Sequence, residues 1–88
     1  MTYRVTLSET AVRQLRKLPA ESRKRIVKCM RLLEEDPFRP RSKADILPIG
    51  DTEPRKYRLR VREYRALYTV AGSEVKVIEV FARGREYR

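Results

Sequence analysis

The stretch Arg55-Lys-Tyr-Arg-Leu-Arg-Val-Arg-Glu-Tyr-Arg65 alternates basic and apolar side chains, with cations at positions 56, 58, 60 and 62. Successive side chains of a β-strand point to opposite faces, so this spacing predicts a strand at 56–62 with one cationic and one apolar face. Like charges on one face repel each other, and an anionic partner offsets that repulsion. The cationic stripe therefore indicates either a surface for a polyanion such as nucleic acid or the solvated outer face of an antiparallel sheet.

Strand-like segments also lie on both sides of this stretch. Residues 65–70 and 74–81 are rich in β-branched and aromatic side chains, and each follows a turn short enough for a hairpin. Residues 36–54 are rich in proline and carry scattered charge, which predicts a loop with a short edge strand at 46–49. The C-terminal third therefore predicts a meander of three strands.

The N-terminal part of the chain predicts one strand and two helices. Residues 3–7 alternate as in a strand, and Ser8 stands where a helix N-cap belongs. An apolar stripe at spacings of four and three predicts a first helix, which Pro19 ends. A second helix is predicted from about 20 to 35, because Pro37 pushes the residue before it out of helical space. The stripe of the first helix consists of Ala11, Leu15 and Leu18.

These elements together predict an α+β fold in one small domain spanning 1–88. Its order is strand, helix, helix and a three-strand meander, with the helical hairpin packed on one face of a mostly antiparallel sheet. A chain of 88 residues is long enough for one modest core and too short for a second domain.

Composition indicates the kind of partner. The chain has 22 Lys and Arg against 12 Asp and Glu, a net charge of +10 and a sequence pI near 10.4. Such a field favours RNA, DNA or an acidic protein as partner. The single cysteine, Cys29, is expected to be a core thiol in a reducing, cytoplasmic setting, and no apolar run approaches the ~18 residues of a membrane span. The absence of asparagine and the single glutamine, Gln14, favour a thermophilic source.

The missing residue types restrict the possible chemistry. Without histidine, the chain has no histidine acid, base or metal ligand, and one cysteine cannot build a cysteine metal site. The acidic run 34–36 is expected to be a solvated helix end, and the glycines are isolated, so we expect no metal and no cofactor. Lys, Arg and Tyr remain. These side chains suffice for RNA cleavage, which needs a base for the 2′-hydroxyl, cations at the phosphate and a proton donor for the leaving oxygen.

A resemblance to the RelE toxins of bacterial and archaeal type II toxin–antitoxin systems, in the RelE/ParE superfamily, extends over essentially the whole chain. It is carried by Lys56-Tyr-Arg-Leu-Arg-Val-Arg-Glu-Tyr-Arg-Ala-Leu-Tyr68 and by Val75-Lys-Val-Ile-Glu-Val-Phe-Ala-Arg-Gly-Arg85 followed by Tyr87. The opening from Tyr3 to Leu18, an aromatic strand leading into a basic helix, is similar to the same family. The resemblance implies a RelE-like toxin domain, of an archaeal or thermophilic kind.

The resemblance also implies an activity and partners. The family's toxins are metal-independent, ribosome-dependent endoribonucleases that cut mRNA in the ribosomal A site and so inhibit translation. An acidic RelB-type antitoxin keeps them inactive. The implied partners of this chain are therefore the ribosome, mRNA and such an antitoxin, with no membrane and no small-molecule cofactor.

Site residues follow from the resemblance by position. Arg65 and Arg85 would clamp the scissile phosphate, and Tyr87 would stack on the substrate base. Strong cutters of the family carry lysine where this chain has Arg58, and arginine does not deprotonate at working pH. Lys56 is therefore the candidate general base, and Arg58 would stabilise developing charge. The further arginines expected to bind RNA are Arg55, Arg60, Arg62 and Arg83.

Two alternatives stay open at this stage. A non-catalytic RNA- or ribosome-binding protein of the same fold would carry the same charge and the same sheet. Lys24, Lys28 and Arg31 share a face of the second helix, and they either grip ribosomal RNA or form a solvated surface. A DNA-binding regulator is disfavoured, because neither helix has a polar recognition face with asparagine or glutamine.

Overall fold

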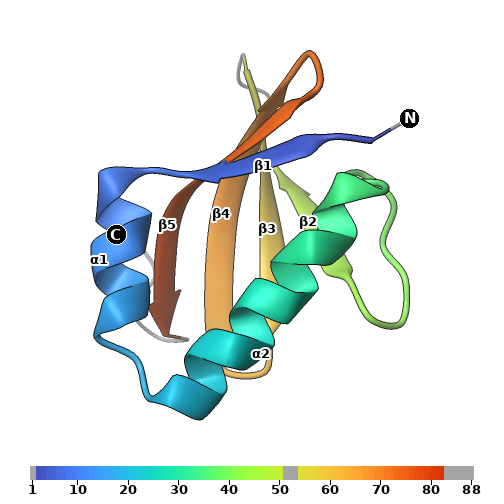
Figure 1. Ribbon diagram of the computed structural model, residues 1–88. Coiled ribbons are helices and arrows are strands. Elements are labelled where there is room, and N and C mark those ends of the chain that lie inside the picture. Colours follow the sequence, from blue (N-terminus) through green and yellow to red (C-terminus); the bar gives the residue numbers. More distant parts are fainter. Residues whose placement is uncertain (1, 51–53, 83–88) are drawn as a thin grey trace.

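The basic stretch forms β3 (Arg55–Val61), which lies between two antiparallel neighbours in the sheet. The computed structural model describes residues 2–50 and 54–82. The other elements are β1 (Arg4–Leu7), α1 (Glu9–Arg16), α2 (Ala20–Arg31), the 3₁₀ turn η1 (Leu32–Glu34), β2 (Asp45–Ile49), β4 (Tyr64–Ala71) and β5 (Glu74–Ala82). Within the described ranges the sheet has the strand order β1-β5-β4-β3-β2 (Figure 1).

The sheet confirms the predicted topology. β2, β3, β4 and β5 form an antiparallel meander, and β1 pairs with β5 in parallel. A parallel pair needs a long crossover, which the two helices and the meander supply. The predicted edge strand exists and begins at Asp45, one residue earlier than expected. The α+β fold with a mostly antiparallel sheet is therefore confirmed.

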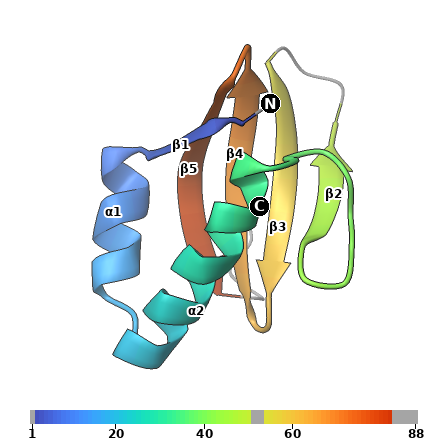
Figure 2. The same ribbon diagram turned by 45° about the vertical axis from the view of Figure 1, so that its right-hand side comes forward.

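The two helices form the predicted hairpin on one face of the sheet (Figures 1 and 2). They run in opposite directions and diverge from Pro19, so that α1 lies beside β5 and α2 runs obliquely across the sheet towards β2. Among the described residues, neither helix combines the length and hydrophobicity that a membrane crossing requires.

α1 covers the part of β5 that β1 does not reach. The Ser8 side chain caps α1 as predicted, since its Oγ accepts from the Ala11 N–H at 3.0 Å. The same Oγ donates to the Ile78 carbonyl at 2.8 Å, and Gln14 Oε1 accepts from the Val80 N–H. β1 pairs with β5 only as far as residue 77, so these contacts satisfy backbone groups that would otherwise lack partners.

α2 ends earlier than the sequence predicts. The apolar pattern predicted a helix to Glu35, whereas α2 ends at Arg31 and the chain tightens into η1. Pro37 disfavours helical conformation in the residue before it. In addition, the Glu34 carbonyl accepts from the Tyr3 N–H at 2.8 Å, so the chain start is fixed to this turn.

The core lies between the helices and the inner face of the sheet. Alternate residues of β3 and β4 meet the apolar stripes of both helices there, as the alternation predicted. Tyr57 and Tyr68 stack with ring centroids 5.5 Å apart, and Phe38 packs edge-on against Tyr57 at 5.6 Å. Other fully buried side chains are Ile26, Leu33, Leu59, Val75 and Val77.

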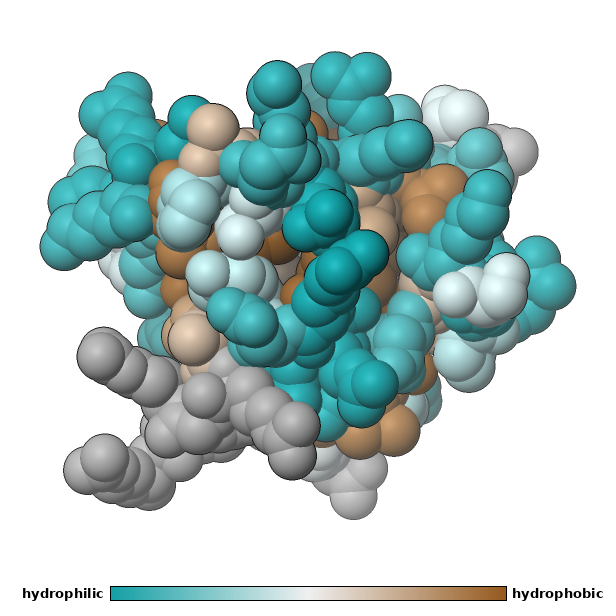
Figure 3. All heavy atoms as spheres, turned by 90° about the horizontal axis from the view of Figure 1, so that it is seen from below, coloured by the Kyte–Doolittle hydropathy of each residue, from teal (hydrophilic) through white to brown (hydrophobic). Residues whose placement is uncertain are grey.

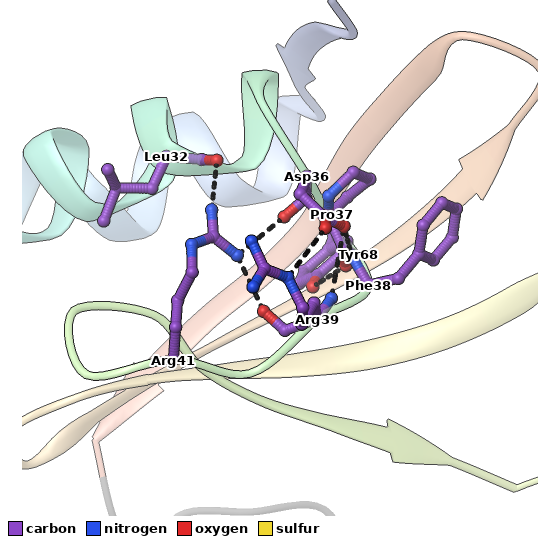
Figure 4. A network of polar contacts seen from close by, with 7 residues as sticks. All are labelled: Leu32, Asp36, Pro37, Phe38, Arg39, Arg41 and Tyr68. Carbon is purple, nitrogen blue, oxygen red and sulfur yellow. Dashed lines mark hydrogen bonds and ion pairs between the residues drawn. The ribbon is translucent and has the colours of Figure 1, made fainter. Parts of the chain in front are cut away.

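Arg41 fastens the loop that follows η1 (Figure 4). Its Nη2 donates to the Leu32 carbonyl at 2.8 Å, which satisfies an acceptor at the end of α2. Its Nη1 donates to the carbonyls of Asp36, at 3.1 Å, and Arg39, at 2.7 Å. The Phe38 N–H donates to the Asp36 carboxylate and lowers the pKa of that carboxyl. Asp36, which the sequence suggested was a solvated helix end, therefore shapes the loop.

The Tyr68 hydroxyl anchors the same loop to the sheet. Tyr68 is fully buried, and its hydroxyl donates to the Pro37 carbonyl at 2.7 Å (Figure 4). We expect Tyr68→Phe to lower the free energy of unfolding by about 1–3 kcal/mol, because the buried carbonyl loses its donor. Urea unfolding measures this change. Tyr64→Phe is the matched control, since its hydroxyl makes no hydrogen bond to the described residues, and it should shift the value by less than about 0.5 kcal/mol.

The buried phenol of Tyr68 also predicts that the stability of the fold depends on pH. Burial raises the pKa of its phenol above the ordinary value. Above about pH 10 the unfolded chain releases this proton, whereas the folded chain retains it. The contribution of Tyr68 to the free energy of unfolding is therefore complete below that pH and is lost as the pH rises. The wild type should therefore lose stability above pH 10 more steeply than Tyr68→Phe. Identical slopes for the two proteins would contradict this assignment.

Candidate functional site

The face of the sheet opposite the helices is called here the open face, because no helix of the described residues covers it (Figures 1 and 2). Directly paired residues of neighbouring strands share a face. Since Tyr57, Leu59 and Val61 are buried on the helix side, the intervening residues of β3 belong to the open face. Strand register places there Leu47 of β2, Lys56, Arg58 and Arg60 of β3, Arg65, Leu67 and Thr69 of β4, and Lys76, Glu79 and Phe81 of β5.

Three cations of β3 form a row on this face. Lys56 and Arg60 are exposed, and Arg58 lies between them, half-buried. Alternate strand residues lie about 7 Å apart, so the row presents evenly spaced positive charges. The expectation that this stripe is uncompensated is wrong for Arg60, whose Nε lies 3.4 Å from the Asp45 carboxylate on β2. Within the described ranges, no carboxylate lies at ion-pair distance from Lys56 or Arg58.

Arg58 has a buried donor that lacks an acceptor. It is flanked by Leu47 on one adjacent strand and Leu67 on the other. Its Nε atom is buried without a hydrogen-bond partner in the described part of the chain. A buried donor in this state costs roughly 1–3 kcal/mol, and an anionic oxygen arriving at the open face would remove that cost. An anionic group placed here on the open face would therefore accept a hydrogen bond from Arg58.

Arg65 is buried instead of presenting its guanidinium to solvent. It is 7% exposed, and its Nη1 donates to the carbonyls of Arg62 and Tyr64, each at 3.3 Å. These bonds hold the β3–β4 turn, in which Arg62 adopts a positive φ of 58°. Non-glycine residues in this region are strained by roughly 1–2 kcal/mol, so the turn needs such support. Arg65 thus has a structural role that the sequence did not indicate, beside the predicted phosphate contact.

The remaining predicted residues do not all gather at this row. Arg62 is exposed in the turn at one end of β3. Arg55 begins β3 opposite Val70, and this register places it on the helix side, away from Lys56. The predicted residues Arg83, Arg85 and Tyr87 lie outside the described residues.

Glu79 is an open-face residue that the sequence did not suggest. Strict alternation from Val75 would place Glu79 on the inner face with Val77. The register of β4 and β5 shifts between Leu67 and Tyr68, and the bulge places Glu79 opposite Leu67. The only sequence signal was the three-residue spacing between the apolar residues at 77 and 80. The bulge brings an exposed carboxylate within two strands, or about 10 Å, of Arg58.

The open face offers cations, the carboxylates of Asp45 and Glu79 and the hydroxyl of Thr69 for chemistry. In the described ranges, no group of three or more carboxylate or thiol side chains is arranged to hold a metal ion. The face can attract a phosphodiester through Lys56 and Arg58, and the Glu79 carboxylate can accept a proton.

Comparison with known protein families gives one match over nearly the whole chain. Residues 5–87 match the family described as "ParE toxin of type II toxin-antitoxin system, parDE". A search of curated protein sequences gave no significant match.

Solved structures of toxin–antitoxin complexes are similar to this chain. The archaeal RelE–RelB complex from Pyrococcus horikoshii OT3 contains a chain 32% identical, with a TM-score of 0.82, and the match covers 98% of this chain and 100% of that one. The RelBE2 complex from Mycobacterium tuberculosis contains a chain 26% identical, with a TM-score of 0.78 and coverage of 94% and 93%. The RelB–RelE complex from Methanococcus jannaschii gives 26% identity, a TM-score of 0.70 and 88% coverage of each chain.

Proposed function

Because the chain belongs to the RelE/ParE family of toxins from type II toxin–antitoxin systems, we propose that it is an endoribonuclease that cuts mRNA in the ribosomal A site. Cutting there removes the message from translation and inhibits growth. A RelB-type antitoxin neutralises it, as the RelB partners in the similar complexes suggest. The reaction uses no metal and takes place in the cytoplasm.

The catalytic part of this proposal rests on one observation, the unsatisfied hydrogen-bond donor of Arg58. Its buried Nε lacks an acceptor in the described chain and lies on a face without helices, next to the exposed Lys56. A phosphate oxygen satisfies this donor, and the arginine then stabilises the extra negative charge that develops at phosphorus.

The open-face residues have separate roles in the proposed reaction. Lys56 takes the proton of the RNA 2′-hydroxyl, whose oxygen attacks the adjacent phosphorus. The bond from phosphorus to the 5′-oxygen breaks, the leaving oxygen takes a proton from water, and a 2′,3′-cyclic phosphate remains. Arg58 binds the phosphate oxygens, and Arg65 holds the turn and adds positive charge from beneath the surface. Arg85 completes the clamp and Tyr87 stacks on the base, while Arg60, Arg62 and Arg83 contact the RNA backbone. Arg55 has no role in this reaction, because strand register places it on the helix side of the sheet. Glu79 is the second candidate for the base.

The ribosome contributes the positioning that this face lacks. A strand of exposed side chains without a histidine provides charge, but it does not hold the 2′-hydroxyl in line with the scissile bond. Fixing the reacting groups in a near-attack geometry is worth many orders of magnitude in rate. We therefore assign orientation of the mRNA to the A site and charge stabilisation to the toxin.

Ribosome dependence tests this proposal directly. We expect purified protein to cut mRNA bound in a ribosomal A site at least about 100-fold faster than the same RNA free in solution, because orientation accounts for most of the gain. Primer extension on both substrates measures the rates. Equal rates would show that the protein carries a complete catalytic set of its own. Binding to ribosomes without cleavage of either substrate would support the alternative, a non-catalytic ribosome-binding protein of the same fold.

A further inference from the structure

A groove lies between α2 and the β3–β4 hairpin, on the flank of the domain. β2 begins at Asp45, which pairs with Arg60, so the β2–β3 ladder does not extend to Val61 or to the turn beyond it. α2 and the loop at 42–43 border this gap and leave a cavity of about 410 Å³. A second cavity of about 140 Å³ continues beneath the turn and shares Arg25, Val61 and Arg62 with the first. Together they form one channel, called here the flank groove.

The shape of the flank groove suits a segment of polypeptide. One side of the groove is bordered by α2 and the start of η1. The lining residues there are Ser22, Arg25 and Cys29 of α2 and Leu32 of η1, at spacings of three and four residues. Ten residues of helix span about 15 Å. That length accommodates about five residues of extended chain, or a helical segment of about ten residues lying alongside α2.

The lining of the groove combines apolar surface with a cationic rim. Cys29, Leu32 and Val61 supply apolar surface. Cys29, which the sequence predicted to be a core thiol, packs against the core but is only half-buried, so one side of it faces the groove. Asp45 also lines the larger cavity, and it is already paired with Arg60. Figure 3 shows hydrophilic side chains around smaller areas of apolar surface at the end of the domain that carries the start of α2 and the β3–β4 turn. The cations of the rim are Arg25, Lys28, Lys43, Arg60 and Arg62.

This lining favours an acidic polypeptide over RNA. Tyr64 lines the smaller cavity, but among the described residues no aromatic side chain lines the larger one, so a base would find no stacking surface in the larger cavity. A phosphodiester backbone would use the rim but not the apolar surface between α2 and Val61. An amphipathic segment with aliphatic side chains flanked by carboxylates uses both.

We propose that the flank groove binds an acidic amphipathic segment of the antitoxin. Identifying the segment as antitoxin rests on the proposed function, whereas the groove and its chemistry do not. Arg60 belongs to both the groove and the open face, and Arg62 lies in the turn beside it. A segment seated in the groove therefore neutralises cations that RNA would use, and it leaves Lys56 and Arg58 uncovered.

Alkylation of Cys29 tests this proposal, because it is the chain's sole cysteine and lines the groove. The probe is a synthetic peptide of about ten residues in which leucines alternate with pairs of glutamates, compared with polyglutamate of equal charge and a single-stranded RNA oligonucleotide. At a peptide concentration about ten times its dissociation constant, maleimide labelling of Cys29 should slow about tenfold. Polyglutamate and RNA should slow it less than about twofold. Because burial raises the pKa of the Cys29 thiol, all rates are compared at one pH.

Charge-reversal variants supply the matched control. Arg25→Glu combined with Lys28→Glu should abolish protection by the peptide, whereas Arg13→Glu with Arg16→Glu on α1 changes net charge equally and should retain it. If RNA protected Cys29 as well as the peptide does, the groove would be a nucleic-acid site. If polyglutamate protected Cys29 equally well, the groove would attract any acidic chain through charge alone. Either result, or no protection by the peptide, overturns the proposal. The assay uses neither ribosome nor cleavage, so it fails or succeeds independently of the proposed function.

Discussion

A chain in which Lys56 and Arg58 are both replaced by alanine no longer arrests growth when it is produced alone. The two residues are adjacent on the open face and have no carboxylate at ion-pair distance among the described residues, so their charge is available to RNA. Removing a donor that stabilises developing charge costs roughly 100- to 1,000-fold in rate. We expect at least that loss in A-site cleavage, measured by primer extension, and a matching relief of growth arrest.

Folding should survive this double substitution. The Nε of Arg58 has no partner in the described chain, so its removal leaves no buried acceptor unsatisfied. We expect the free energy of unfolding to change by less than about 1 kcal/mol. Arg13→Ala with Lys17→Ala removes the same charge from α1 and should leave cleavage unchanged. Growth arrest by a soluble, folded Lys56/Arg58 variant would place the chemistry elsewhere.

Arg65 is a less decisive target, although the sequence suggested it first. Its guanidinium is buried and donates to two carbonyls of the β3–β4 turn, so Arg65→Ala leaves both acceptors without their donor. A loss of activity in that variant would combine the effects of the missing charge and of an altered turn. Lys56 and Arg58 lack such contacts within the described residues, which makes them the sharper test.

The alternation at 56–62 predicted β3 and its two faces because one face of the sheet is buried and the other is not. Burial of one face fixes the strand register, because a shift by one residue would expose the apolar side chains. In β3 these side chains are Tyr57, Leu59 and Val61, and all three are buried. The same rule failed on β5, where a bulge between the partners of Leu67 and Tyr68 moves Glu79 to the open face. The bulge is accompanied by tertiary contacts, in which Ser8 and Gln14 bind the backbone of Ile78 and Val80. The local sequence pattern of β5 contains no sign of these contacts.

Charge counting did not predict the individual contacts of the basic residues. The alternation placed Arg60 in the cationic stripe, but it could not show that Asp45 lies opposite it on a strand from a different part of the chain. It also gave no sign that Arg65 would be buried, since a basic residue is expected to be exposed at the surface. These outcomes depend on pairing across strands and on a turn with positive φ, and both are properties of the assembled sheet.

Production of this chain together with its acidic RelB-type antitoxin should yield a stable complex that neither arrests growth nor cuts mRNA. At +10 the isolated domain repels itself, and an acidic chain neutralises that charge while covering apolar surface in the flank groove. We expect a dissociation constant near 1 nM or lower, equivalent to about −12 kcal/mol of binding free energy. Co-purification and calorimetry measure the complex.

The salt dependence of this complex separates long-range electrostatic attraction, which affects the association rate, from short-range contacts, which affect the dissociation rate. The Debye length shortens from about 10 Å at 0.1 M salt to about 3 Å at 1 M, so long-range attraction between the two chains should fade over that range. We therefore expect the association rate to fall steeply with added salt, while the dissociation rate, set by the apolar contacts, changes little. Arg25→Glu with Lys28→Glu should lower the association rate and weaken its dependence on salt, because both charges lie at the rim of the groove. If the antitoxin leaves cleavage untouched, or if no acidic protein co-purifies from the native host, the toxin–antitoxin mechanism fails for this chain, and RNA binding without cleavage explains its charge better.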